Sequence, residues 1–460
     1  MQSNNNSSSS SSNSNSSNIN LESKESLEKL FDAVINGLAS PLDDVAQKKL
    51  ICTEKGTIRD IIANYEIICK NDKIIQSHIK FNEFSRTLEL DGKPFTDADL
   101  VTFTTYFSSV YELQSKSNLF DVLNRYNVPC YHPIKDKILE GIDEFRLPTA
   151  QSSSYIDNFF QNVCHKVAKD DDETIYFREV ARMIFYGGIK RLFEPGSKFD
   201  YFVIFEGKQG TGKSRLVEML NPVEKYYSDL RTIDGKEACE CIDGSFIIEL
   251  SELLALVRAK DVEAMKAFIT RTVDKYRPAY GRYTAEVPRC NVFIGTTNDA
   301  SFLTDVTGNR RYLPINIDET KPYEFFEGYA DTKKYIMSCW KEAYLLYKAG
   351  KIYTNIPSVY NPILEAQRKM REIDNPVIGA IIDYVENYDP SKRCYEDKVC
   401  ALEIYINCMN GLKKNYSRQS AKEIANIMST IPGWSRNNKA CRFKEYGPQK
   451  YWQKENSTNL

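Results

Sequence analysis

The chain has 460 residues, which corresponds to about three domains of ordinary size, and 42% of them are hydrophobic, enough to form packed cores. This composition excludes a chain that is disordered throughout. Its 61 Lys and Arg residues against 63 Asp and Glu residues leave a net charge of −2. The chain as a whole therefore has no basic field that would attract nucleic acid, and any such partner must meet a local patch.

The sequence shows neither a secretory signal pattern nor a run of 18 apolar residues, so we expect the chain to stay inside the cell. Its twelve cysteines are spread from Cys52 to Cys441 without a CxxC pair, which favours reduced thiols over a disulfide framework. The chain has three histidines, His78, His132 and His165. We therefore expect no structural zinc site, and we expect any catalysis to rest on other groups.

The N-terminal part of the chain offers elements but no recognisable chemistry. Residues 1–20 contain 10 Ser and 7 Asn and are predicted to form a disordered tail. Residues 21–120 combine a helical stretch at 26–39 with strand-like pieces at 78–90, which predicts an α+β domain. Its role is unknown, and a structural or docking role is the default interpretation. Residues 121–196 are predicted to form a helical, collar-like lead-in, because apolar residues recur at helical spacing between 152 and 192.

A phosphate-binding loop is predicted where residues 201–206, YFVIFE, form a buried strand that is followed by GKQGTGKS and then by a helix. In this setting the glycines let backbone N–H groups surround a phosphate, the lysine reaches the β- and γ-phosphates, and the serine hydroxyl binds Mg²⁺. The sequence therefore predicts an α/β domain over residues 197–318, built on a parallel sheet, with ATP and Mg²⁺ as cofactors. The expected ligands are Gly207, Gly210, Thr211, Gly212, Lys213 and Ser214.

Two acids follow on a second buried strand, residues 244–253. Glu249 or Glu252 can hold the Mg²⁺, while the other can polarise the attacking water. The residues alone leave open which acid takes which role.

Polar groups also follow the third buried strand, residues 291–298. Asn298 ends it, and a neutral amide there can hydrogen bond both the γ-phosphate and the lytic water. Arg310 and Arg311 come next, and we expect at least one of them to face a phosphate, because guanidinium groups stabilise the charge that develops in phosphoryl transfer.

Residues 274–283, between the second and third strands, alternate Lys and Arg with Tyr around a Pro/Gly turn, which is typical of a β-hairpin. Basic groups beside aromatic rings suit sequence-tolerant binding of a single strand. The expected DNA contacts are Lys275, Arg277, Tyr280 and Arg282. A purely structural hairpin also fits the pattern, and Arg277 or Arg282 can instead face the nucleotide of an adjacent subunit.

The C-terminal part is predicted to be a helical linker over residues 319–390 and a basic module over residues 391–460, where 13 Lys and Arg stand against 6 Asp and Glu. Helices at 401–409 and 420–428, the second with a capping box of Ser420 and Glu423, and a hairpin after Trp434 predict a winged-helix-like module. A solvated basic surface that binds a protein is the alternative. The expected phosphate contacts are Lys413, Lys414, Arg418, Arg436, Lys439 and Arg442.

Five motifs in this order resemble the virulence-associated protein E family, whose motor is similar to superfamily 3 helicases of the AAA+ class. They are GKQGTGKS (207–214), FIIELSEL (246–253), YRPAYGR (276–282), FIGTTN (293–298) and TGNRRYLPI (307–315). The resemblance covers residues 120–460. It implies an AAA+ motor in which Lys213 and Ser214 form the Walker A pair, Glu249 is the Walker B acid and Asn298 is a polar sensor.

The resemblance also implies that Arg310 and Arg311 hold an arginine finger, which is inserted into the site of a neighbouring subunit. One departure stands out, because Leu250 follows Glu249 where the superfamily has a second acid. Glu252 is left as the candidate for that second carboxylate.

By this resemblance we expect an ATP-dependent DNA helicase or translocase that acts as a ring, with six subunits as the expected number. It would serve replication of a phage, plasmid or mobile genetic element in the bacterial cytoplasm, at the nucleoid. Expected partners are single-stranded or forked DNA and a separate primase or polymerase, and no membrane. The alternative is an ATP-dependent replication initiator or loader without processive unwinding. A P-loop kinase of a small metabolite explains neither the basic C-terminus nor the arginine pair.

Overall fold

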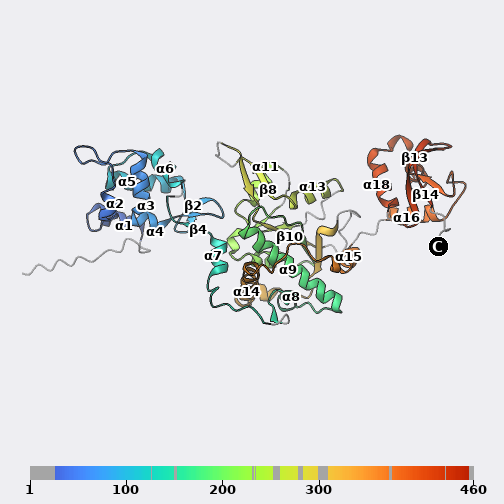
Figure 1. The fold of residues 1–460 in the computed structure, drawn as a ribbon, viewed down its shortest axis with the longest axis horizontal. Helices are drawn as coiled ribbons and strands as arrows, with labels where there is room; N and C mark the ends of the chain where they lie inside the picture. Colours follow the sequence, from blue (N-terminus) through green and yellow to red (C-terminus); the bar gives the residue numbers. More distant parts are fainter. Residues whose placement is uncertain are drawn as a thin grey trace, which may run out of the picture.

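The structure is a computed structural model that describes residues 26–125, 127–149, 153–230, 233, 235–251, 259–277, 283–298, 309–371, 376–429 and 431–454. Figure 1 shows an N-terminal group of elements, a central group built on the largest sheet, and a C-terminal group. Across these ranges, no helix combines the length and the apolar character that crossing a lipid bilayer requires.

The central sheet has five strands within the described residues, all parallel, in the order β11-β5-β10-β7-β6. The parallel sheet of an α/β fold, which the sequence predicted, is confirmed, and the three predicted strands are β5, β7 and β10. The two edge strands, β6 and β11, were not predicted from the sequence. β6 is short and polar, and β11 contains Pro314, which a sheet tolerates at its edge. The bounds are β5 (Phe202–Glu206), β6 (Tyr227–Asp229), β7 (Ile247–Ser251), β10 (Val292–Thr297) and β11 (Tyr312–Asn316).

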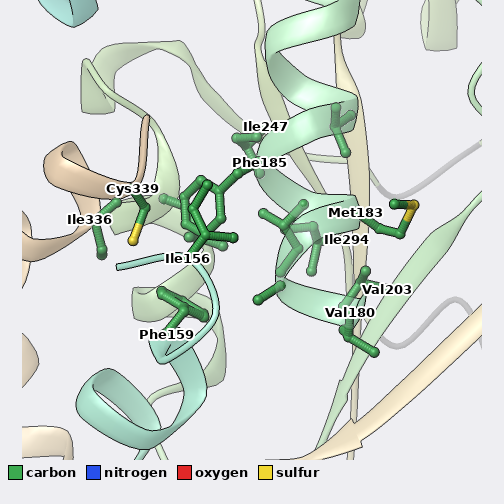
Figure 2. Packing of buried hydrophobic residues seen from close by; sticks show 14 of the residues in the cluster. Ile156, Phe159, Val180, Met183, Phe185, Val203, Ile247, Ile294, Ile336 and Cys339 are labelled. Carbon is green, nitrogen blue, oxygen red and sulfur yellow. The ribbon is translucent and has the colours of Figure 1, made fainter. Parts of the chain in front are cut away.

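Side chains alternate between the two faces along each strand, so both faces of this sheet carry apolar side chains. Helices cover both faces. Val203, Ile247 and Ile294 pack in the larger core cluster with side chains of α9 (Asp171–Phe193) and α14 (Tyr329–Lys348), as Figure 2 shows in part. Phe202 and Ile248 pack on the other face with α11 (Gly235–Ile242) and α13 (Ala259–Ile269). The central group also contains α7 (Pro133–Leu139), α8 (Phe159–Cys164), α10 (Lys213–Leu220), α15 (Asn361–Lys369), η2 (Glu224–Tyr226), η3 (Asn309–Arg311), η4 (Pro322–Phe325) and η5 (Ser358–Tyr360).

The position of β5 fixes where a ligand can bind. β5 lies between β10 and β11, so the loop after β5 leaves the sheet at the point where the strand order reverses. In open α/β sheets, ligands bind at this point, beyond the carboxyl ends of the strands. An antiparallel pair, β8 (Val273–Tyr276) and β9 (Ala285–Pro288), lies outside this sheet and forms the hairpin that the sequence predicted, as far as the described residues show it.

The N-terminal group has its own sheet, in the order β3-β2-β1-β4, and its own apolar core, which includes Tyr65, Phe103 and Phe107. The predicted helix within 26–39 and the predicted strands within 78–90 are both present. The elements are α1 (Leu27–Ile35), α2 (Asp44–Gln47), α3 (Ile62–Asn71), α4 (Lys73–His78), β1 (Ile79–Asn82), β2 (Thr87–Leu90), β3 (Lys93–Pro94), α5 (Asp97–Tyr111), α6 (Lys116–Leu123) and β4 (Cys130–Tyr131).

The C-terminal group packs helices against a sheet of order β12-β14-β13. Its first helix, α16, lies within the range that the sequence assigned to a linker, yet its Ile381 and Val385 are part of this core. The predicted capping box at Ser420 is wrong. The helix begins a turn earlier, because the hydroxyl of Ser417 accepts a hydrogen bond from the Ser420 N–H at 3.2 Å. The elements are α16 (Pro376–Glu386), β12 (Lys398–Cys400), α17 (Ala401–Asn407), η6 (Lys413–Asn415), α18 (Arg418–Met428), β13 (Trp434–Phe443) and β14 (Gly447–Lys454).

Close packing between α9 and α14 makes a testable prediction at Gly188. A Cβ atom at this position would lie 2.6 Å from the ring of Trp340, which is fully buried. Gly188→Ala should lower the free energy of unfolding by about 1–3 kcal/mol, the usual cost of overpacking, as measured by denaturant unfolding. Lys334→Ala, on the exposed surface of α14, should change it by less than about 0.5 kcal/mol. Equal effects of the two substitutions would contradict this packing.

Candidate functional site

The loop between β5 and α10 forms a cradle that only glycine permits at two positions. Gly207 and Gly212 have φ angles of +155° and +81°. A Cβ atom on Gly207 would lie 2.7 Å from Oδ1 of Asp318, and one on Gly212 would lie 2.7 Å from the ring of Phe325. The two glycines therefore let the loop curl closely around the N-terminus of α10, the position at which backbone N–H groups bind phosphate in loops of this kind.

Lys213 and Asn298, two of the site residues that the sequence singled out, meet at this loop. The Lys213 ammonium donates to the carbonyl oxygens of Gly207 at 2.7 Å and Lys208 at 2.8 Å, and to Oδ1 of Asn298 at 2.8 Å. Burial lowers the pKa of the Lys213 amine from its usual range. The cation is thus held by neutral oxygens directly beside the glycine cradle, and Asn298 at the end of β10 is one of its ligands.

Glu249 lies at the centre of the site and is buried, with 1% of its surface exposed. The Ser214 hydroxyl donates to its Oε1 at 2.8 Å, and the Thr296 hydroxyl donates to the same oxygen. The Tyr227 hydroxyl donates to Oε2 at 2.5 Å. Burial, followed by this bond to a carboxylate, raises the pKa of Tyr227 well above its usual range. Hydroxyl groups from three separate elements therefore satisfy one buried carboxylate.

Neither Tyr227 nor Thr296 was among the site residues predicted from the sequence. Thr296 stands in the polar run that ends β10, and that run was a signal in the sequence. Tyr227 lies on the edge strand β6, which carries no motif, so nothing in the sequence pointed to it. Glu252, the other candidate acid, lies outside the described residues.

Asp318 and Thr320, to which the sequence assigned no role, follow the end of β11 next to the loop and support it. Asp318 accepts a hydrogen bond from the Lys208 N–H at 2.6 Å, and the Thr320 hydroxyl donates to the carbonyl oxygen of Thr211 at 2.6 Å. Partial desolvation alone would raise the pKa of Asp318, but the Lys208 N–H, Asn316 and nearby lysines hold it below its usual range. These bonds fix both ends of the cradle.

Arg310 and Arg311 lie where the parallel strands begin, which we call the amino edge of the sheet. The loop lies at the opposite side, where the strands end, which we call the carboxyl edge. The two arginines immediately precede β11, whose first residue, Tyr312, pairs with Phe202, while its last residue pairs with Glu206 next to the loop. Five residues of strand separate the two edges by about 16 Å. Arg310 is exposed, and its carbonyl oxygen accepts a hydrogen bond from Arg368 at 2.9 Å. Nε of Arg311 is buried without a hydrogen-bond partner in the described part of the chain.

The hairpin β8–β9 holds part of the predicted DNA-binding set. Lys275 forms an exposed ion pair with Glu286 on the facing strand at 2.5 Å, and Arg277 is exposed at the end of β8. Tyr280 and Arg282 lie outside the described residues. At the other end of the hairpin, Arg289 and Asp274 form a buried ion pair with contacts of 2.6 and 2.9 Å.

Six basic residues of the C-terminal group that the sequence singled out are exposed, and none has a carboxylate partner in the ranges that the structure describes. Lys413 donates to the carbonyl oxygen of Glu445 at 3.3 Å, and the guanidinium of Arg436 lies 5.6 Å from the ring of Trp452. They are distributed over η6, α18 and β13, and comprise Lys413, Lys414, Arg418, Arg436, Lys439 and Arg442.

The fold and the site define a mixed α/β protein with a five-stranded parallel sheet and a glycine loop at its switch point. Residues 146–372 match the family model of the virulence-associated protein E-like domain, and the chain therefore carries this domain. The match confirms the resemblance inferred from the five motifs. It includes the glycine loop, Glu249, the hairpin and the arginine pair.

Two solved structures to which the chain is similar share little sequence with it. The apo structure of the NrS-1 C-terminal region is 13% identical, with a TM-score of 0.44, and the match covers 82% of this chain and 96% of that one. The X-ray structure of JCV helicase is 12% identical, with a TM-score of 0.28, and the match covers 78% of this chain and 92% of that one. No curated protein matches the chain.

The donor set fits a magnesium nucleotide. A serine hydroxyl and a carboxylate oxygen 2.8 Å apart are oxygen ligands of the kind that Mg²⁺ prefers. The glycine cradle and the Lys213 ammonium beside it offer N–H groups and positive charge to a chain of phosphates. These residues therefore fit both Mg²⁺ and the phosphates of a nucleotide.

The bonds around Asp318 make a prediction about pH. Because its folded-state pKa is lowered, its contribution to stability is present above its ordinary pKa near 3.8 and is lost as the pH falls through the folded value. Asp318→Asn should therefore lower the free energy of unfolding at pH 7, by less than about 1 kcal/mol because the side chain is exposed. The difference from wild type should shrink below pH 4. Asp143→Asn, at an exposed position of the same group, serves as the matched control, and a difference between wild type and Asp318→Asn that grew in acid would contradict the assignment.

Proposed function

We propose that the chain is an ATP-dependent DNA helicase or translocase of the superfamily 3 type, an AAA+ motor that acts as a homo-oligomeric ring. One observation carries this proposal. Lys213, Glu249 and Asn298 converge at the carboxyl edge of the parallel sheet, whereas the arginine pair stands at the amino edge of the same sheet. Such a protomer holds most of a hydrolytic site at one edge and offers the missing cation at the other.

In the proposed mechanism, the residues of the carboxyl edge bind and orient ATP. The loop N–H groups and Lys213 would hold the phosphates, and Ser214 and Glu249 would hold Mg²⁺, which neutralises charge on the phosphates when it is bound. Lys213 must exchange its contacts with the loop carbonyl oxygens for the phosphates. Asn298 is then released to orient the attacking water, and Glu249 or Glu252 is the candidate base.

The arginine pair would act on a neighbouring protomer. A separation of about 16 Å between the two edges is longer than an arginine side chain, so Arg310 does not reach the loop of its own chain. Its guanidinium is exposed, and its backbone is held by Arg368. Contacts that place the amino edge of one protomer on the carboxyl edge of the next are heterologous, and such contacts give a ring when their rotation closes. We propose a closed ring of six subunits.

DNA contacts are proposed at two places. The hairpin β8–β9 carries exposed Lys275 and Arg277 and would track the strand in the centre of the ring. The C-terminal group combines two helices with the β13–β14 hairpin, the plan of a winged-helix-like module, and its exposed basic residues would bind phosphates without reading sequence. The biological role proposed is replication of a phage, plasmid or mobile element, together with a separate primase or polymerase.

An assay of ATP hydrolysis and strand displacement on a forked duplex tests this proposal. Wild type should hydrolyse ATP faster when single-stranded DNA is added and should displace the shorter strand. Lys213→Ala should lose hydrolysis at least about 100-fold, because it removes the cation that binds the phosphates, and Lys334→Ala, at an exposed lysine of α14, should match wild type.

Three outcomes of the assay distinguish the alternatives. DNA binding that depends on ATP but displaces no strand would favour the replication initiator or loader. Hydrolysis that ignores DNA would contradict a DNA motor and favour an enzyme that acts on a small molecule. Lys213→Ala protein as active as wild type would contradict the assignment of the nucleotide site.

A further inference from the structure

A short turn of the N-terminal group, residues 82–86 between β1 and β2, contacts two different parts of the central group. One contact is made next to the strand that supplies a ligand of Glu249, and the other is made at the base of the hairpin proposed to bind DNA. The sequence assigned no chemistry to this region of the chain. The contacts of the turn give it one.

The first contact of the turn is with η2. Asn82, which is fully buried, donates from Nδ2 to the Tyr226 hydroxyl at 2.8 Å, and the ring of Phe84 meets the Tyr226 ring edge-on with centroids 5.0 Å apart. Phe84 belongs to the core cluster of the central group rather than to that of its own group. Tyr226 immediately precedes Tyr227, whose hydroxyl binds Glu249. One end of the turn is therefore anchored one residue from the nucleotide site.

The second contact of the turn is with the hairpin. The guanidinium of Arg86 forms an ion pair with Asp243 and donates to the Tyr276 hydroxyl at 3.2 Å. The Tyr276 hydroxyl donates to the same carboxylate at 2.5 Å. Tyr276 is the last residue of β8, so this group of three side chains holds the outer end of that strand. Arg86 has a φ angle of +55°, a conformation that non-glycine residues keep only where their surroundings impose it.

The hairpin needs such support, because an isolated two-stranded hairpin is marginally stable in water. Its inner end is fixed by the buried pair of Arg289 and Asp274, both of which belong to the central group. Its outer end is fixed through Tyr276, to which Asp243 and Arg86 bind. The N-terminal group therefore supplies the cation of the outer anchor.

We propose that Arg86 is a positioning residue for the hairpin, and that the turn 82–86 couples the position of the hairpin to the nucleotide site. The proposal rests on the proposed function in its second part only, since the first part concerns the hairpin itself. Without Arg86, Asp243 and Tyr276 keep their mutual hydrogen bond but lose the link to the N-terminal group. The β-strands β8 and β9 then move independently of η2. Binding of a DNA strand to the hairpin therefore has less effect on ATP hydrolysis.

The test compares Arg86→Ala with Arg125→Ala in the full chain. Arg125 is an exposed arginine of the same group, with an ion pair to Glu66 at 3.8 Å and no contact to the hairpin among those the structure gives it. Hydrogen exchange measures the amides of 273–276 and 285–288, and ATP hydrolysis is measured with and without single-stranded DNA. In Arg86→Ala, exchange in both strands should rise, hydrolysis without DNA should stay unchanged, and stimulation by DNA should fall about fivefold or more. Arg125→Ala should match wild type in all three measurements.

A charge exchange distinguishes a direct pair from a general loss of stability. Arg86→Asp should raise exchange in the hairpin, and the double variant R86D/D243R should bring it back toward the wild-type value. Unchanged exchange in Arg86→Ala would overturn the positioning role, and raised exchange with full stimulation by DNA would overturn the coupling. Wild-type protein that does not respond to DNA would refute the proposed function and the coupling with it, while hydrogen exchange would still decide the positioning role.

Discussion

All strands of a parallel sheet run in the same direction, so the edge where they end differs chemically from the edge where they begin. This constraint determines the arrangement of the central part of the molecule. All strand ends that follow an apolar run emerge at the carboxyl edge, where Lys213, Glu249 and Asn298 meet. Everything that precedes a strand emerges at the amino edge, where Arg310 lies. No rotation of side chains brings the two sets together within one chain. The division of groups between the edges makes hydrolysis a property of two protomers in the proposed function.

The contacts of Glu249 extend this constraint into the rest of the molecule. Its carboxylate joins α10 through Ser214, β10 through Thr296 and β6 through Tyr227. Asn82 donates a hydrogen bond to Tyr226, the residue before Tyr227. The N-terminal group is therefore anchored directly beside the edge strand β6. The hydrogen bonds of this one carboxylate therefore connect three elements of the site, and the N-terminal group is bound next to one of them.

The sequence predicted the parts of the site that lie on apolar strands and in the glycine loop, because burial on both faces and a fixed glycine spacing leave a strong local pattern. Lys213 and Asn298, both singled out from the sequence, lie in contact at the loop. It did not predict Tyr227, Asp318 or Thr320, which act through hydrogen bonds made across the fold and stand in short polar segments. The edge strands were missed for a related reason, since β6 has three residues and β11 contains Pro314. The role of Arg86 depends on packing between two groups of elements, which no local pattern encodes.

Mixing two inactive variants tests the central claim, that each site is completed by a neighbour. Lys213→Ala removes the phosphate ligand, with an expected loss of hydrolysis of at least about 100-fold, and Arg310→Ala removes the cation offered to the next protomer, with an expected loss of about 10³-fold or more. In a mixture, some interfaces join an intact loop to an intact arginine, so hydrolysis should recover to a clear fraction of the wild-type rate, with a maximum near equal amounts. Hydrolysis that is no greater in the mixture than the sum of the two variants, while they assemble together, would contradict the account.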